Sequence, residues 1–267
     1  MIWHTYQEGK KPTLVFIHGW LNNWTVWKKS REYFHKKGYS TLTLDLRGYG
    51  HSAHVQQPYT IKQYAEDIHE LIKKKGCKRH IIIGHSMGSI IALTYQLTYK
   101  TAEGLILCNG TARSALTKHL PKNAEHPLAK LLNTIENYTP NHTKIKHIDF
   151  SKKDIKNLTD IEFLHKAIQT AQIRATIDSF KEMVTFDCHN KLKEIAVPTT
   201  VIHSTEDKLF SFELGEELAQ KIPHTTLCTI SGRHRTTIEN TREINQYIDL
   251  HLKNSANYRK KGNPLQR

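Results

Sequence analysis

Apolar residues along the chain gather in short runs, and longer segments with helical periodicity separate these runs. The run at residues 13–17 reads Thr-Leu-Val-Phe-Ile and ends at a His-Gly turn, which is typical of a buried strand. Comparable runs lie at residues 40–46, 80–83, 104–108, 199–203 and 225–230. Helix-length segments occupy residues 61–74, 89–99 and 212–222. The alternation predicts an α/β fold with a mostly parallel sheet flanked on both faces by helices.

One long stretch departs from this alternation. Residues 109–197 contain no strand-like run, and their clearest patterns are helix-like, at residues 127–137 and 161–184. We therefore predict a helical cap inserted at residues 111–189, over the carboxyl edge of the sheet. The insertion is rich in lysine, including Lys118, Lys122, Lys144, Lys146, Lys152, Lys153 and Lys156.

The length of the chain favours one domain with one insertion. At 267 residues, the chain is long enough for a single α/β domain with its own core. We assign residues 1–110 and 190–252 to this α/β core. Residues 253–267 are basic and poor in apolar side chains, so we expect a frayed basic tail or a remnant of cloning there.

The chain is strongly positive. Lysine and arginine total 39 against 25 acidic residues, which gives a formal net charge of +14. Such a surface attracts acidic proteins, anionic membrane surfaces or nucleic acid over long range, although a lysine-rich source proteome is the simpler explanation. No zinc finger, RNA-binding signature or interleaving of aromatic and basic residues accompanies the charge. Nucleic acid is therefore not an expected partner.

The N-terminal residues and the cysteines indicate a cytoplasmic protein. Residues 1–7 lack the basic and apolar parts of a signal peptide, and no run approaches the roughly 18 apolar residues that span a bilayer. The cysteines show no C-x-x-C spacing and are too few for a disulfide framework in a chain of this length. They are Cys77, Cys108, Cys188 and Cys228. We expect reduced, mostly buried thiols, no metal site and no integral membrane association.

The sharpest motif is a serine between two glycines. Residues 81–92 run from three isoleucines through Gly-His-Ser-Met-Gly into a helix-like segment. In this setting G-x-S-x-G is a nucleophile elbow, a turn so sharp that side chains two residues before and after the serine would collide. Gly84 and Gly88 satisfy this requirement, and Ser86 is the predicted nucleophile. The alternative is a glycine-rich strand-to-helix turn that merely contains a serine.

A serine hydroxyl needs a base and an orienting acid to become a nucleophile. His234 lies in the loop after the last predicted strand and is the predicted base, whereas His224 precedes that strand and would lie at its wrong end. Asp207 follows the strand at residues 199–203 and is the predicted acid, preferred to Glu206 for its place in the loop. The resulting mechanism requires no metal or organic cofactor.

Acyl transfer also needs donors for a developing oxyanion, and two backbone N–H groups serve this role well. The His-Gly-Trp turn at residues 18–20 follows an early strand, and Met87 directly follows the serine. The N–H groups of Trp20 and Met87 are therefore the predicted oxyanion hole and the predicted substrate-binding groups. A simple tight turn is the alternative interpretation of residues 18–20.

Together these motifs resemble the α/β-hydrolase superfamily over nearly all of the chain outside the cap. Residues 45–52 are similar to the D-x-R-G-x-G-x-S turn of that superfamily, which we interpret as architectural. Residues 192–198 resemble the segment before its acid-bearing strand. The order Ser86, Asp207, His234 is also the order of this superfamily. The resemblance implies the α/β-hydrolase fold.

The His-Gly-Trp turn further resembles that of the pimeloyl-acyl carrier protein methyl ester esterases. In that family the tryptophan N–H is one oxyanion donor and a basic cap holds an acidic carrier protein, so the resemblance implies an acidic acyl carrier protein as a partner. Two positions depart from the common pattern. Arg233 replaces a small residue and is expected to narrow the pocket mouth or to meet an anionic substrate, and Ser204 replaces a frequent glycine.

The predicted function is that of a serine hydrolase of the carboxylesterase type, which cleaves a small-molecule ester or an acyl thioester. Serine at the elbow argues against haloalkane dehalogenase and epoxide hydrolase chemistry, which use an aspartate there. A C–C bond hydrolase or an aminopeptidase uses the same three residues, and both stay open. A ligand-sensing protein with little turnover is the alternative from another class. A peripheral membrane lipase would need a long apolar stripe on the cap, and we find none in the sequence.

Overall fold

Seven strands form a single sheet in the computed structural model, which describes residues 1–114 and 145–260. The sheet order is β1-β3-β2-β4-β5-β6-β7. The strands are β1 His4–Gln7, β2 Lys11–Ile17, β3 Tyr39–Leu44, β4 His80–His85, β5 Leu105–Cys108, β6 Thr199–Ser204 and β7 Thr225–Ile230. β1 is antiparallel to β3, and every other neighbouring pair is parallel. The prediction of a mostly parallel sheet is confirmed.

The predicted apolar runs correspond to six of these strands. The predicted run at residues 225–230 has the same first and last residues as β7. β4 continues two residues beyond its predicted end, to His85, so the strand leads directly into Ser86. The sequence did not predict β1. Its four residues are only half-buried, and such an edge strand has no apolar run by which to recognise it.

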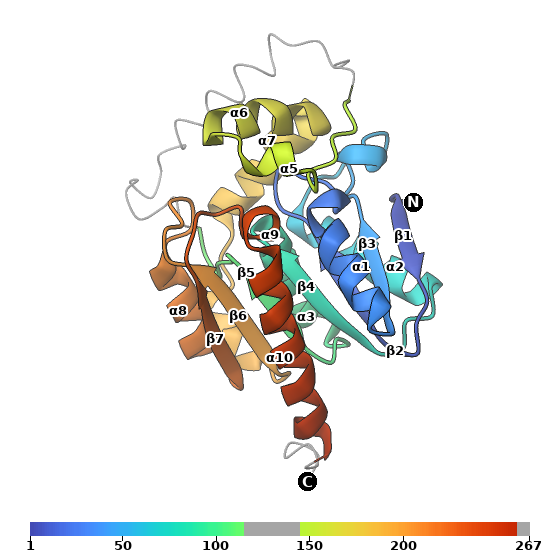
Figure 1. Cartoon of the computed structure of the whole chain (residues 1–267), viewed down its shortest axis with the longest axis vertical. Helices are drawn as coiled ribbons and strands as arrows, with labels where there is room; N and C mark the ends of the chain where they lie inside the picture. The colour runs from blue at the N-terminus through green and yellow to red at the C-terminus, as the bar shows by residue number, and fades with distance from the viewer. Residues whose placement is uncertain (115–144, 261–267) are drawn as a thin grey trace.

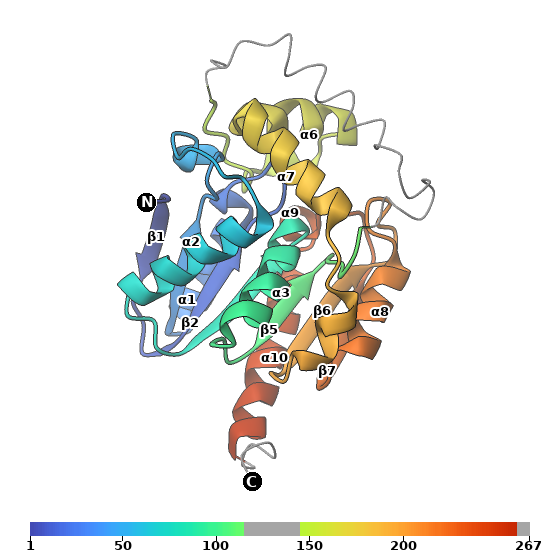
Figure 2. The same cartoon turned by 180° about the vertical axis from the view of Figure 1, so that it is seen from behind.

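Helices cover both faces of the sheet (Figures 1 and 2). One face carries α1 Lys28–Lys36 and α10 Thr241–Lys260, and the other carries α2 Ile61–Lys74, α3 Met87–Tyr99 and α8 Phe212–Lys221. α2 has the predicted bounds, and its N-terminus is capped by Thr60, whose side chain accepts from the N–H of Gln63. The shorter elements of the core are η1 Trp24–Trp27, η2 Gly50–Ser52, η5 His189–Glu194 and α9 Thr236–Glu239.

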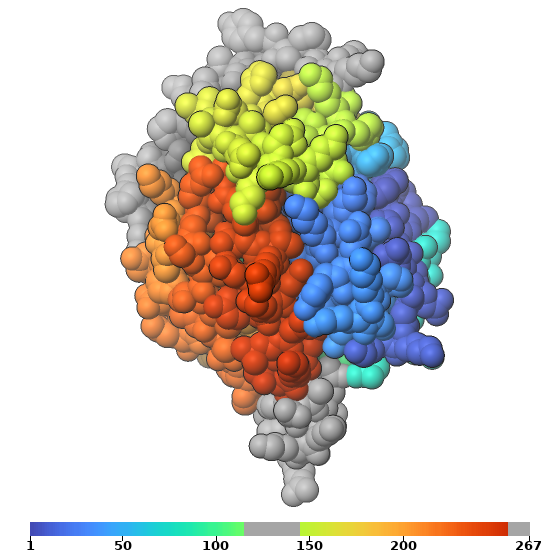
Figure 3. Space-filling view, viewed as in Figure 1, coloured from blue at the N-terminus to red at the C-terminus, as the bar shows by residue number. Residues whose placement is uncertain are grey.

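Three helices lie across the carboxyl edge of the sheet, and we call α5 Lys153–Lys156, α6 Asp160–Ala167 and α7 Ile173–Thr185 the cap helices (Figures 1 and 2). In the space-filling view they rest on the segments around α1 and α9 (Figure 3). The helix predicted at residues 127–137 lies outside the described residues.

The prediction of one helix over residues 161–184 is wrong. A 3-10 turn, η4 Ile168–Thr170, follows α6, and the chain then becomes extended at Ala171. The core causes this break: the N–H of Gln172 donates to the carbonyl of Gly48 at 2.8 Å, and Ala171 forms an antiparallel bridge with Tyr49. A tertiary hydrogen bond thus overrides local helical periodicity.

The prediction of a tail that begins at Lys253 is also wrong, because α10 continues to Lys260. His251 explains the continuation, since its Nδ1 contacts the Thr200 hydroxyl of β6 at 2.9 Å and its Nε2 contacts the Ser255 hydroxyl at 3.2 Å. Ser255 is fully buried by these contacts. Residues 261–267 lie outside the described residues. The four cysteines are all buried and unpaired, as the sequence predicted.

Candidate active site

Ser86 stands on a strained turn between β4 and α3. Its φ of 56° and ψ of −121° lie outside the regions that non-glycine residues favour. Its N–H donates to the carbonyl of Cys108 at 2.9 Å, which anchors the turn to β5. A Cβ on Gly84 would collide with the carbonyl of Gly88, and a Cβ on Gly88 would collide with the carbonyl of Ile17. Both glycines are therefore required by space, as the elbow predicts.

The three predicted triad residues lie within hydrogen-bond distance of one another. The Nε2 of His234 is 2.8 Å from the Oγ of Ser86, and its Nδ1 is 2.6 Å from the Oδ2 of Asp207. An ionised carboxylate only accepts hydrogen bonds, so Nδ1 carries the proton and Nε2 accepts from the serine hydroxyl. This tautomer is the one in which the histidine can take the proton of Ser86.

The loops after β6 and β7 supply the acid and the base. Asp207 is the residue that contacts His234, whereas Glu206 accepts from the Ser231 hydroxyl at 3.2 Å on the surface. His224 precedes β7 and lies at the other end of that strand. The geometry thus agrees with the choice of Asp207 over Glu206 and of His234 over His224.

The side chain of Asp207 is fully buried and yet well supplied with donors. Its Oδ1 accepts from the N–H groups of Leu209 and Phe210 at 2.8 and 2.9 Å. Burial raises the pKa of Asp207, but the hydrogen bond and charge of His234, the Asn109 amide and the Phe210 N–H outweigh it and lower the pKa to about 2. Asp207 is therefore ionised throughout the neutral range.

Asn109 is a site residue that sequence reasoning missed. It follows β5 in the left-handed conformation, with φ of 46°. Its Nδ2 donates to the Oδ2 of Asp207 at 2.6 Å and to the Oγ of Ser204 at 2.5 Å, while its Oδ1 accepts from the Thr236 hydroxyl at 2.9 Å. The position was discoverable, because residues at the carboxyl ends of parallel strands gather at one edge. Ser204, which departs from the superfamily pattern, has a partner here.

His85 is a second residue that sequence reasoning did not single out. Its Nε2 lies 2.8 Å from the backbone carbonyl of His234 and must donate to it, because a carbonyl only accepts. Burial, followed by the proximity of His234, lowers the pKa of His85 to about 3. The ring therefore stays neutral and ties the loop of His234 to the end of β4.

The His-Gly-Trp turn lies directly against the elbow. A Cβ on Gly19 would lie 3.1 Å from the Cβ of Ser86, which shows how closely the turn approaches the serine. His18 is fully buried, and its Nε2 accepts from the N–H of Leu46 at 3.0 Å, so its Nδ1 donates to the carbonyl of Gly19 at 2.8 Å. Burial lowers the pKa of His18 and keeps this arrangement neutral.

The two predicted oxyanion donors adjoin Ser86 from different segments. Met87 is the first residue of α3, where a backbone N–H has no partner within its own helix. Within residues 1–114 and 145–260, no hydrogen bond engages the N–H of Trp20 or of Met87. The indole of Trp20 instead donates through Nε1 to the carbonyl of Thr176 at 2.9 Å, which joins the turn to α7.

Residues 45–52 form a turn held by hydrogen bonds to Asp45. This agrees with the interpretation of this segment as structural rather than catalytic. Asp45 is fully buried and accepts from the N–H of Trp24 at 2.7 Å and from the N–H and Nδ1 of His51 at 2.8 and 2.9 Å. Arg47 pairs through two nitrogens with Asp67, at 2.6 and 2.5 Å. Within the described part of the chain, Asp45 forms no hydrogen bond with the triad; its bonds hold the loop together.

Two arginines flank the base and bind it to the cap. Arg235 is buried and donates to the carbonyl of Leu158 at 2.8 Å, and its guanidinium lies 4.8 Å from the centre of the Phe163 ring. Arg233 pairs with Glu239 at 2.6 Å and with Asp160, the first residue of α6, at 3.1 Å. Arg233 was expected to narrow the pocket mouth or to meet an anionic substrate. In the structure its guanidinium pairs with Glu239 and Asp160, so an anionic substrate would have to compete with these two carboxylates.

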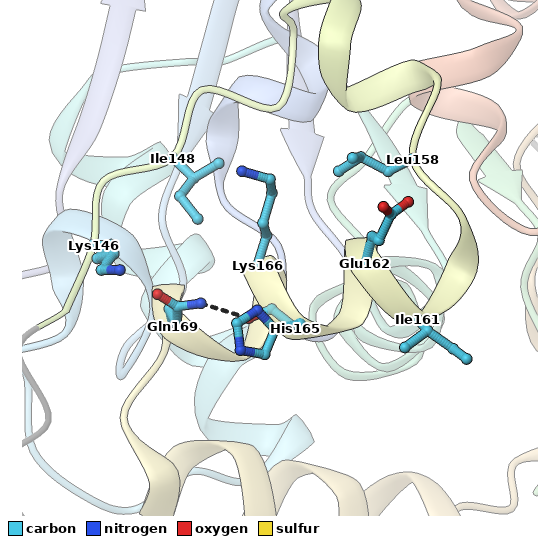
Figure 4. A pocket seen from close by; sticks show the side chains of 8 residues that line it. All are labelled: Lys146, Ile148, Leu158, Ile161, Glu162, His165, Lys166 and Gln169. Carbon is cyan, nitrogen blue, oxygen red and sulfur yellow. Dashed lines mark hydrogen bonds between the residues drawn. The ribbon is translucent and has the colours of Figure 1, made fainter.

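A groove of about 630 Å³ lies on the cap, and its lining contains none of the triad residues (Figure 4). Ile148, Leu158 and Ile161 supply its apolar surface, and Lys146 and Lys166 supply amines. Ile161 of α6 is 82% exposed, and the sequence alone did not predict that this apolar side chain faces solvent.

In residues 1–114 and 145–260, no helix has the length and apolar character needed to span a bilayer. The same residues contain no group of side chains that could hold a metal ion.

The sheet order, the elbow after the central strand and the helices over the carboxyl edge define an α/β-hydrolase. The comparisons agree. The chain belongs to the hydrolase family described as serine aminopeptidase, S33, whose sequence profile matches residues 8–241. The protein is thus a hydrolase of the α/β-hydrolase superfamily, and the resemblance stated from its motifs is confirmed.

Several known proteins are similar to the chain along most of its length. The AB hydrolase superfamily protein YisY of Bacillus subtilis (strain 168) is 26% identical over 247 residues, which cover 90% of this chain and 91% of that protein. A pimeloyl-[acyl-carrier protein] methyl ester esterase of Vibrio atlanticus (strain LGP32) is 23% identical over 244 residues, with coverage of 84% and 87%. A thermophilic esterase from Thermogutta terrifontis superposes with a TM-score of 0.74 at 22% identity, with coverage of 95% and 94%. The structural likeness shows the fold.

Proposed function

We propose that this hydrolase is a serine carboxylesterase, which cleaves ester or thioester bonds through Ser86, His234 and Asp207. The observation that carries the proposal is the continuous line of contacts from the Ser86 Oγ through the imidazole to Asp207, at 2.8 and 2.6 Å. These are the distances that a nucleophile, its base and an orienting acid require.

In the proposed reaction His234 accepts the Ser86 proton through Nε2 while Oγ attacks the substrate carbonyl. Asp207 holds the imidazole in its tautomer and stabilises the imidazolium that forms. His234 then gives the proton to the leaving alcohol or thiol, which leaves an acyl group on Ser86. Water, activated by the same histidine, attacks this acyl-enzyme and releases the acid.

The N–H groups of Trp20 and Met87 are the proposed donors to the oxyanion of both tetrahedral intermediates. Their support is the placement of both residues against Ser86 and the lack of another hydrogen-bond partner for either N–H among the described residues. Donors held ready by the fold stabilise the developing charge without having to reorganise. The same two groups are the proposed points of contact with the substrate carbonyl.

An acyl group on an acidic carrier protein is the proposed special substrate. The similarity to a pimeloyl-[acyl-carrier protein] methyl ester esterase supports it, as does the exposure of four cap lysines, Lys146, Lys152, Lys153 and Lys156. Their positive charge favours an acidic partner. The family description favours one competing substrate class, the N-terminal residue of a peptide, because a serine aminopeptidase uses the same trio.

Substrate preference and the nucleophile can be tested together. Initial rates on p-nitrophenyl esters of increasing acyl length are compared with rates on aminoacyl p-nitroanilides, and a fluorophosphonate probe labels the reactive serine. We expect turnover of short esters and labelling, both reduced by at least about a thousandfold in Ser86→Ala and His234→Ala. Ser211→Ala, which removes an exposed serine from the N-terminus of α8, is the matched control and should keep full activity.

The outcomes separate the candidates. Anilide cleavage without ester cleavage would replace the carboxylesterase by an aminopeptidase. A wild-type protein that is folded but is not labelled at Ser86 would refute the serine hydrolase mechanism itself.

A further inference from the structure

We infer that Asn109 is a positioning residue of the triad, which holds the acid and the loop of the base in one frame. The inference rests on the proposed function of Ser86, His234 and Asp207. Asn109 touches neither the serine nor the reacting atoms. It acts through its contacts with Asp207 and with Thr236, which lies two residues after the base.

The orientation of the Asn109 amide follows from its partners. The Oδ2 of Asp207 only accepts hydrogen bonds, so the group that faces it at 2.6 Å must be the Nδ2 of Asn109. Oδ1 then faces the Thr236 hydroxyl, which donates to it at 2.9 Å. A reversed amide would place an oxygen against the carboxylate and would break that contact, although the Thr236 hydroxyl could still accept from the reversed NH2 group. The side chain therefore has a single favourable orientation.

The Asn109 amide joins three strands at the carboxyl edge of the sheet. It projects from the end of β5, contacts Ser204 at the end of β6, and reaches the segment that follows β7. Asn109 is fully buried, and its own N–H donates to the carbonyl of Ile202 at 2.8 Å. Since the residue cannot shift without loss of these contacts, it fixes the separation of Asp207 from the loop of His234.

The same amide also affects the charge balance of the site. Its N–H points its positive end at the carboxylate oxygen that also binds the Nδ1 of His234. The Asn109 N–H partly offsets the negative charge of Asp207. Without it, the carboxylate would attract the imidazolium of His234 more strongly and would stabilise the protonated base. A purely structural residue would not alter the pH at which the base becomes available.

The test uses Asn109→Gly, because φ of 46° at this position would strain alanine, whereas glycine adopts it freely. The readout is the rate constant of Ser86 labelling by a fluorophosphonate between pH 5 and 9, together with kcat and KM on an ester that the wild type cleaves. We expect kcat and the labelling rate to fall about tenfold or more, with KM little changed. The acid limb of the pH profile should move to higher pH.

Two further variants complete the test. Thr236→Val keeps the shape of a fully buried residue but removes the donor to the Asn109 Oδ1, and it should give a smaller loss in the same direction. Gln96→Ala is the matched control, because it removes another buried amide. Gln96 lies on α3, away from the triad, and its Oε1 accepts from the N–H of Ala102 at 3.2 Å. It should lower the thermal midpoint but leave kcat and the pH profile unchanged.

The results distinguish failure of this inference from failure of the proposed function. A wild type that is not labelled refutes the proposed function. A labelled wild type with an Asn109→Gly variant of equal rate and equal profile overturns the positioning role alone. The role is equally overturned if Asn109→Gly loses rate with an unshifted profile and the loss matches that of Gln96→Ala.

Discussion

Ser86 holds a backbone conformation that costs free energy, and its neighbours keep it there. A non-glycine residue in such a region costs roughly 1–3 kcal/mol, and here φ is 56°. The turn that results lifts the hydroxyl out of the strand and toward the Nε2 of His234. The close approach of Gly84 to Gly88, and of Gly88 to Ile17, leaves the backbone no other path.

Gly88→Ala should therefore unfold or severely destabilise the elbow. The added methyl group would collide with the carbonyls of Ile17 and His18, so we expect a loss of about 3 kcal/mol or more in the free energy of unfolding. Urea titration followed by circular dichroism measures this loss.

Gly76→Ala is the control, because its φ of 62° is strained for alanine, but beyond its own residue and its two chain neighbours no described atom lies within 4 Å of the added methyl group. It should cost only about 1–2 kcal/mol. Equal costs for the two variants would show that collision at Gly88 is not the reason for glycine there.

At the scale of elements, the loop of the base and the N-terminal end of α6 behave as one packed unit. Arg235 reaches the carbonyl of Leu158 and the ring of Phe163, and it also pairs with Glu239 at 2.9 Å. The cap is thus fastened to the segment that carries His234, and the Trp20 indole makes a second link between the core and α7.

Arg235→Met should loosen the cap and weaken substrate binding. The methionine keeps the apolar stem but removes the donor to Leu158 and one partner of Glu239, so we expect a loss of about 1–3 kcal/mol in stability and a rise in KM larger than the fall in kcat. Thermal unfolding and steady-state kinetics on an ester measure the two effects.

Arg79→Met is the matched control, since its pair with Glu103 is exposed, with 56% of the arginine side chain accessible. Such a pair contributes about 0–1 kcal/mol. The proposed link between cap and base would be contradicted if Arg235→Met behaved like Arg79→Met in both measurements.

At the scale of the whole molecule, several histidines are buried in their neutral form. Burial lowers the pKa values of His18, His80, His85 and His203 below the ordinary value near 6.5. In the unfolded chain these groups take up protons below that pH, whereas in the folded protein they do not. Above pH 6.5 these histidines therefore do not lower the free energy of unfolding. As the pH falls below 6.5, proton uptake by the unfolded chain lowers it.

Acidification should consequently lower the stability of the protein well above the pH at which Asp207 is protonated. His85, with its pKa of about 3, alone accounts for about 2 kcal/mol between pH 6.5 and 5. Urea titrations at pH 7.5, 6.5 and 5 measure the effect. His80→Gln should reduce the slope, and the exposed His54→Gln should not. A free energy of unfolding that is constant over this range would contradict the prediction.

Local patterns predicted most of the core of this fold, and the exceptions have tertiary causes. The bounds of α2 and β7 follow from the sequence because periodicity, caps and apolar runs are properties of adjacent residues. The break between α6 and α7 depends on the bond from Gln172 to Gly48, and the extension of α10 depends on the contact of His251 with Thr200. No local pattern contains such contacts.

The sequence by itself determined the order of six of the seven strands, the elbow and the identity of the candidate nucleophile, acid and base. It could do so because a sharp turn requires glycine at set positions, and because loops after parallel strands converge at one edge. Only the tertiary structure decided that Asn109, His85 and Arg235 support that site, because their partners are distant in the chain. An amide between a buried carboxylate and a hydroxyl acquires its role from their three-dimensional arrangement, which no spacing along the sequence encodes.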